Sequence, residues 1–110
     1  KYPIIKYFAI SNVETIKQIE SAYSYLPNNI ILVPKIESIL GIREIKVISQ
    51  ALKEDKRIMM LDHDDLFSDI LSKNETVDHY IDLINSLVLF CKKENITLLR
   101  TRGVIFSDEI

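Results

Sequence analysis

The sequence has one cysteine, two glycines, three prolines and no tryptophan among its 110 residues. A single cysteine cannot form an internal disulfide or a multi-cysteine zinc site, which favours a reducing compartment. We therefore expect a cytoplasmic protein. The few glycines and prolines, together with 47% hydrophobic residues, argue against disorder and indicate a packed core.

Two further features are missing: an excess of one charge and a long apolar run. The formal net charge is −2, from 14 Lys and Arg against 16 Asp and Glu, so the composition has no general attraction for nucleic acid. Clean apolar runs such as residues 30–33 and 58–61 are far shorter than the ~20 residues of a membrane helix. We expect neither nucleic acid nor a membrane as a partner.

The sequence does contain an alternation of short β-rich runs and longer segments of helical period. The β-rich runs cover residues 4–10, 30–36, 57–61 and 97–106, and the segments between them repeat apolar residues three to four positions apart. Connections that contain a helix are too long for hairpins, so they are right-handed parallel crossovers. Nearly continuous apolar strands indicate a sheet covered on both faces or the wall of a barrel. The sequence predicts one α/β unit of parallel βα repeats over residues 1–110.

Polar residues mark the expected starts of the helices. Asn12 stands where the N-cap of the first helix is expected, and Asn74 or Thr76 stands before the third. The second helix is expected as one continuous segment. Cys91 falls on the apolar stripe of the third helix and is expected in the core.

Acidic residues gather where the second and third predicted strands end. Glu37 follows the second strand, and Asp62, Asp64 and Asp65 follow the third. Ligand sites of parallel α/β proteins lie at the carboxyl ends of the strands, and two carboxylates there suit a hard divalent ion. The alternative is that Glu37 caps the following helix and that the three aspartates cap a short helix over residues 66–71.

The same segments resemble motifs of a known enzyme group. Residues 35–38 (Lys-Ile-Glu-Ser) with Gly41 are similar to the "(K)IE(S/T/N)xxG" element of phosphoenolpyruvate/pyruvate-binding barrels, and the strand leading into Asp65 and Leu66 is similar to their "(G)xxDL" element. Both occur in order, on successive predicted strand ends. The resemblance is closest to the HpcH/HpaI aldolase and citrate lyase beta-subunit family, and it is best over residues 30–71.

This resemblance implies that the chain is about half of a TIM (β/α)8 barrel and a fragment of a larger protein, inactive on its own. The implied parent is a carbon–carbon lyase or aldolase of the citrate lyase type. It would act on a 2-oxo-acid or acyl-CoA thioester through a metal-stabilised enolate. Glu37 and Asp65 would ligate Mg²⁺ or Mn²⁺, and Lys35 would be catalytic by neutralising an enolate or a bound carboxylate.

The implied substrate site extends to other residues. Backbone amides around Asp64 and Asp65 would bind the carboxylate of the ligand. Arg100 or Arg102 is expected to bind an anion, with a structural ion pair as the alternative. Because a half barrel has two free sheet edges, we also expect a homo-oligomer.

The sequence departs from the family pattern next to this site. Asp62 and His63 stand where family members usually have a glycine and another small residue, and Asn12 stands where they commonly have lysine. His63 is either a third ligand or general base, or part of a surface loop. The alternative function is therefore a non-catalytic α/β oligomerisation or binding module with a degenerate metal site.

Overall fold

A computed structural model describes residues 6–101, which form a four-stranded parallel sheet with the strand order β1-β2-β3-β4. The strands are β1 (Lys6–Ile10), β2 (Ile30–Ile36), β3 (Ile58–Asp62) and β4 (Thr97–Thr101). The predicted α/β class with parallel βα repeats is confirmed. The parts of the first and fourth predicted strands at residues 4–5 and 102–106 lie outside the described residues.

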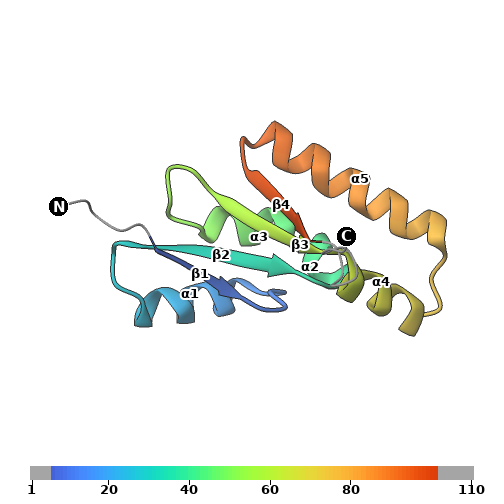
Figure 1. Ribbon diagram of the computed structural model, residues 1–110, viewed down its shortest axis with the longest axis horizontal. Helices are drawn as coiled ribbons and strands as arrows, with labels where there is room; N and C mark the ends of the chain where they lie inside the picture. The colour runs from blue at the N-terminus through green and yellow to red at the C-terminus, as the bar shows by residue number, and fades with distance from the viewer. Residues whose placement is uncertain (1–5, 102–110) are drawn as a thin grey trace, which may run out of the picture.

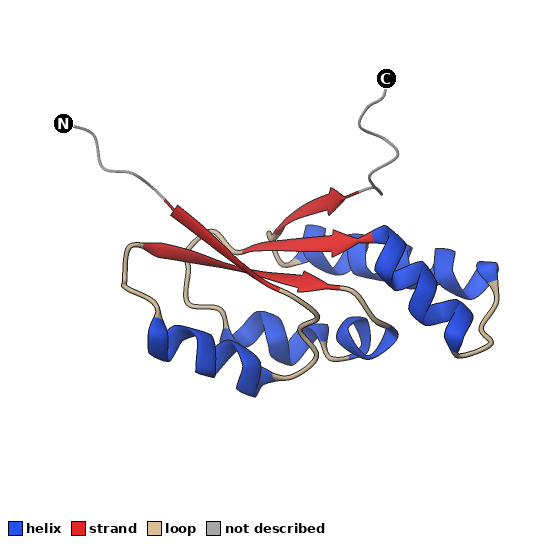
Figure 2. Cartoon of the chain, turned by 60° about the horizontal axis from the view of Figure 1, so that its bottom comes forward, coloured by secondary structure: helices blue, strands red, loops and turns tan. Residues whose placement is uncertain are grey.

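The helices of the described chain lie together on one side of this sheet (Figures 1 and 2). They are α1 (Ile16–Tyr25), α2 (Ile39–Arg43), α3 (Ile45–Ala51), α4 (His63–Ser72) and α5 (Val77–Lys93). Right-handed crossovers between strands that follow one another in the sheet place every connecting helix on the same face. Within residues 6–101, no helix is long and apolar enough to cross a membrane.

One hydrophobic core fills the space between the sheet and the helices. Leu32 and Ile36 of β2 and Met59 and Leu61 of β3 point into it and are fully buried. The core side chains of the helices include Ile19, Ile48, Leu66, Ile70, Leu87 and Cys91, so the predicted burial of the cysteine is confirmed. Alternate residues of the strands point to the opposite face, which no helix of the described chain covers.

The first helix begins three residues later than predicted. Its N-cap is Thr15, whereas Asn12 has a φ of 50° and belongs to the preceding loop. The Gln18 side chain holds this loop: its Oε1 accepts from the Thr15 amide at 2.9 Å and its Nε2 donates to the Asn12 carbonyl at 3.0 Å. A glutamine beyond the expected cap therefore decides where the helix starts.

The second predicted helix is two helices, because the chain breaks at Glu44 between α2 and α3. Its buried isoleucines recur at intervals of three residues, at Ile39, Ile42, Ile45 and Ile48. A regular helix has 3.6 residues per turn, so such a row rotates away from one face by 60° at each step. The break at Glu44 keeps both halves of the row directed into the core.

The start of α5 at the Thr76 N-cap is confirmed, with the Thr76 side chain accepting from the His79 amide at 3.1 Å. The short helix expected over residues 66–71 is instead α4, which begins at His63. Asp62 is its N-cap and accepts from the Asp65 amide at 3.0 Å.

Gly41 lies in the middle of α2 against the loop between β1 and α1. A Cβ atom at this position would stand 2.8 Å from the Val13 carbonyl oxygen, although the backbone of Gly41 does not have a positive φ. The glycine of the "IESxxG" element is therefore required here by close packing of α2 against a backbone carbonyl.

We expect Gly41→Ala to lower the free energy of unfolding by about 1–3 kcal/mol, because the methyl group displaces the Val13 carbonyl. At an unobstructed helix position the same change raises stability by about 1 kcal/mol. Urea unfolding followed by circular dichroism measures the sign, and a stabilised variant would contradict the packing argument.

Candidate metal centre

The Glu37 and Asp65 side chains meet at the carboxyl end of the sheet. Glu37 directly follows β2, and Asp65 lies in the first turn of α4, directly after β3. The Asp65 carboxyl group is within hydrogen-bonding reach of the Glu37 carboxyl group. Two acids that are 28 residues apart in the sequence therefore form one pair, as the positions of the two strand ends predicted.

The Glu37 side chain is only 12% exposed and has two further partners. Its Oε2 atom accepts from the Asn12 amide at 3.1 Å and lies 3.6 Å from Lys35 Nζ. Burial raises the pKa of Glu37, and the neighbouring Asp65 carboxyl raises it further. The Asn12 amide and the Lys35 ammonium oppose this shift without cancelling it. On balance, the Glu37 carboxyl group is easier to protonate than an ordinary glutamate.

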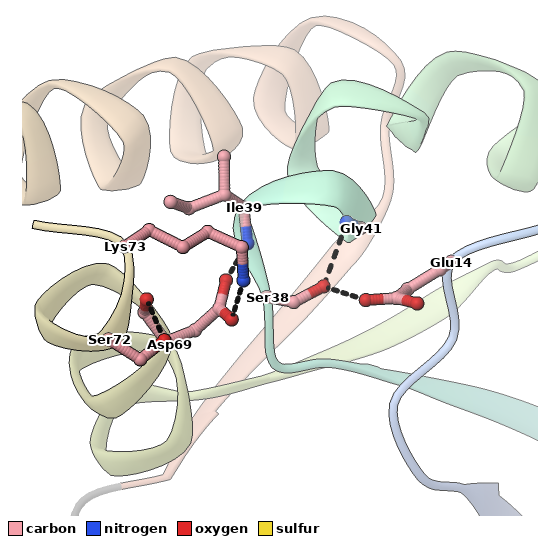
Figure 3. A network of polar contacts seen from close by, with 7 residues as sticks. All are labelled: Glu14, Ser38, Ile39, Gly41, Asp69, Ser72 and Lys73. Atoms are coloured by element: carbon pink, nitrogen blue, oxygen red, sulfur yellow. Dashed lines mark hydrogen bonds and ion pairs between the residues drawn. The ribbon is translucent and has the colours of Figure 1, made fainter. Parts of the chain in front are cut away.

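The β1–α1 loop that supplies the Asn12 amide is tied to the end of β2. The Val13 amide donates to the Lys35 carbonyl at 3.0 Å. Ser38 Oγ donates to Glu14 Oε2 at 2.6 Å and accepts from the Gly41 amide at 3.1 Å (Figure 3). These bonds fix the loop above Glu37.

A second set of bonds fixes α4, and with it Asp65. Asp69, one turn after Asp65, accepts from the Ile39 amide at 2.8 Å and from Lys73 Nζ (Figure 3). Burial would raise the pKa of Asp69, but the bonds from Lys73 and Ile39 outweigh it and hold the pKa below its ordinary value. The start of α2, next to Glu37, is thereby joined to the helix that carries Asp65.

A cleft of about 380 Å³ opens at this pair. Its lining consists of carboxylates, hydroxyls and one amide side chain, from Asn12, Glu14, Glu37, Ser38, Asp65, Ser68, Asp69 and Ser72. A lining of oxygen ligands without thiols or imidazoles suits a hard cation such as Mg²⁺.

Among residues 6–101, no group of three or more His, Cys, Asp or Glu side chains is arranged to hold a metal. A cation between Glu37 and Asp65 would therefore take its other ligands from water and substrate, which is the usual behaviour of Mg²⁺. If water and substrate complete the coordination, the two carboxyl groups fit the divalent cation that the sequence predicts.

The other predicted site residues are divided between this cleft and a neighbouring group. Lys35 Nζ is 3.6 Å from Glu37 Oε2, although Lys35 is not among the residues that line the cleft. Arg100 does not line the cleft: its Nε donates to His63 Nε2 at 3.1 Å, and His63 Nδ1 is 3.0 Å from the Tyr80 hydroxyl. Arg102, the other candidate for anion binding, lies outside the described residues.

Asp64 is exposed at the start of α4 and its charge acts on Tyr80. Burial raises the pKa of Tyr80, and the Asp64 carboxylate adds to the shift, while Arg100 opposes it. Of the backbone amides expected to bind a ligand carboxylate, that of Asp65 already donates to Asp62 Oδ1. A ligand would have to compete with this cap for the Asp65 amide.

The sequence did not single out Glu14 or Asp69, nor did it suggest that the Asn12 amide reaches Glu37. A signal existed for Asn12, because asparagine adopts positive φ more readily than other non-glycine residues. The spacing of Asp69 and Lys73 marks an ion pair on one helix face. The bond from Asp69 to Ile39 crosses 30 residues and has no local signal.

We expect Asp69→Asn to lower the free energy of unfolding at pH 7 by about 1 kcal/mol, because the charge-assisted bonds to Lys73 and Ile39 weaken. A lowered folded-state pKa stabilises the fold above the ordinary carboxyl pKa of ~4, and this contribution disappears as the pH falls through the folded value. Urea unfolding of both proteins between pH 7 and pH 2 should therefore show their difference shrinking below pH ~4. A difference that grows on acidification would contradict the assignment.

Comparisons with models of protein families, with curated proteins and with solved structures find no match to this chain. The resemblance to the aldolase and citrate lyase family therefore depends on the two sequence motifs alone.

Proposed function

We propose that this chain is the cation-binding part of a carbon–carbon lyase or aldolase that acts on a 2-oxo-acid or an acyl-CoA thioester. The observation that carries the proposal is the Glu37–Asp65 pair. Two adjacent carboxyl groups repel each other when both are ionised, and either a shared proton or a bound cation relieves that repulsion. We take the bound cation as the relief. Structural ion pairs also shift pKa values, so the oxygen lining of the cleft is the second support.

The residues around the Glu37–Asp65 pair have separate roles in this function. Glu37 and Asp65 hold the divalent ion, Mg²⁺ or Mn²⁺. When bound, such an ion supplies a Lewis acid for the keto oxygen of the substrate. Lys35, whose Nζ is 3.6 Å from Glu37, places a positive charge where it can pair with the carboxylate of a bound oxo-acid. The Asn12 amide and the tied β1–α1 loop keep the Glu37 carboxylate in place.

We further propose that the four strands are part of a TIM barrel wall, and that the whole protein works in the cytoplasm. Consecutive strand order, helices on one face of the sheet, and a cleft at the carboxyl ends of the strands are features that such a barrel wall also has.

One observation favours the alternative of a non-catalytic binding module. Asp62 occupies the Asp65 amide, which the related barrels are expected to offer to the ligand. In this alternative, the Glu37–Asp65 pair shares a proton and binds no cation with useful affinity.

Calorimetric titration with Mn²⁺ tests the proposal. We expect one site, weakened at least about tenfold in Glu37→Gln and in Asp65→Asn, because each change removes one of two anionic ligands. Asp64→Asn is the matched control: it removes a neighbouring exposed carboxylate in the same helical turn and should leave the affinity unchanged. Absence of Mn²⁺ binding, or equal loss in the control, would favour the non-catalytic module.

We expect Lys35→Met to have opposite effects on two ligands. Mn²⁺ should bind more tightly, because the Lys35 ammonium no longer neutralises Glu37. Pyruvate added to the Mn²⁺-loaded protein should bind more weakly, because its carboxylate loses a cation. Relaxation of water protons by Mn²⁺ reports both events, and unchanged pyruvate binding would remove Lys35 from the substrate site.

A further inference from the structure

The face of the sheet opposite the helices is apolar and has no cover within the described chain. A hollow of about 410 Å³ on this face is lined by Tyr7, Ala9, Val33, Ile58, Met60 and Leu99. Tyr7 is 60% exposed and Leu99 is 45% exposed, although both are large hydrophobic side chains. All-parallel sheets occur almost only with both faces covered. This face is therefore built to be covered.

The edges of the same sheet are also free. β1 and β4 are the outer strands, and each pairs with one neighbour in the described chain. Residues 6–9 of β1 are exposed, and so are Thr97, Leu99 and Arg100 of β4, whereas the central strand β2 is largely buried. A second parallel sheet that paired with both β1 and β4 would form hydrogen bonds with their unpaired backbone groups. The same sheet would also cover the apolar face.

A second copy of this chain has the required edges. A two-fold axis along the strands brings β4 of each copy beside β1 of the other, with all strands parallel and both contacts identical. The sum is eight strands, about the number at which side chains just fill the interior of a barrel.

The size of the surface favours a partner that engages the edges as well as the face. Four strands ~4.8 Å apart and ~16 Å long present a face on the order of 300 Å². A stable interface buries ~800 Å² on each partner, so a protein that lay only on the face would bury too little. Closure at both edges adds the sides of β1 and β4 and the helices beside them.

We infer that the open face of the sheet and the edges of β1 and β4 form an interface with a second copy of this chain, which closes the sheet into a barrel. This inference rests on the barrel part of the proposed function, with a second copy of this chain supplying the other strands of the barrel, and not on its cation chemistry. The apolar hollow becomes the interior, and the cleft at Glu37 and Asp65 stays at the open carboxyl-end rim.

Sedimentation equilibrium over a wide range of protein concentration tests the inference. The wild-type chain should show a species of twice its 12.8 kDa mass. Tyr7→Lys and Leu99→Lys should each weaken dimerisation at least about tenfold, because a lysine is placed in the covered interior. Leu89→Lys is the matched control: Leu89 is 65% exposed on α5, on the helix side, and its replacement should leave the dimer intact. Circular dichroism verifies the fold of each variant.

A mixing experiment separates barrel closure from simple stacking of two open faces. One chain carries Lys6→Cys on β1 and the other carries Thr97→Cys on β4, while the native Cys91 is buried. A flexible thiol cross-linker should join the two different chains and not two copies of either one.

A wild-type chain that is monomeric at every concentration would overturn the inference. So would a dimer unaffected by both lysines, or cross-linking only between identical variants. Loss of Mn²⁺ binding in Glu37→Gln with an unchanged dimer would separate the interface from the cation site. The dimer of a wild-type chain that binds no Mn²⁺ would overturn the proposed function and leave this inference standing.

Discussion

The helices and the sheet are held together by one layer of contact, in which alternate strand residues pack against every helix from the same side. Leu32, Ile36, Met59 and Leu61 belong to this layer, and each is fully buried. Because the strands follow one another in the sheet and every crossover is right-handed, the helices have only one face on which to pack. Because β2 and β3 pair in parallel, their carboxyl ends are neighbours, and Glu37 and Asp65 come together there.

The proximity of the Glu37 and Asp65 carboxyl groups is unfavourable, and hydrogen bonds of the surrounding residues stabilise the segments that carry them. Glu37 is mostly buried beside a second carboxyl group, and the only direct compensation from the described chain is the Lys35 ammonium and the Asn12 amide. The loop carrying Asn12 is held by Val13 and Glu14, and α4 is held by Asp69. The backbone segments that carry Glu37 and Asp65 are therefore held in place from both sides.

Local patterns were sufficient for the strands, the α5 cap and the burial of Cys91, because each depends on the residues beside it in the sequence. They were insufficient for the start of α1 and for the break at Glu44. In α1 the Gln18 side chain, beyond the expected cap, binds the loop. Near Glu44, the buried isoleucines recur every three residues, and in a regular helix they would turn away from the core. The break at Glu44 keeps them buried. Both outcomes depend on contacts that the capping residues and the periodicity of apolar residues do not predict.

The sequence by itself determined the parallel α/β class, the order of the strands and the positions of Glu37 and Asp65 at neighbouring strand ends, since periodicity and spacing are local properties. The tertiary structure decided which partners those residues have. It placed Arg100 with His63 and Tyr80 rather than in the cleft, and it joined Tyr23 to Glu54 across 31 residues, a hydrogen bond of 2.7 Å. Contacts between side chains distant in sequence depend on how the helices pack against the sheet. Packing of this kind has no periodic pattern in the sequence.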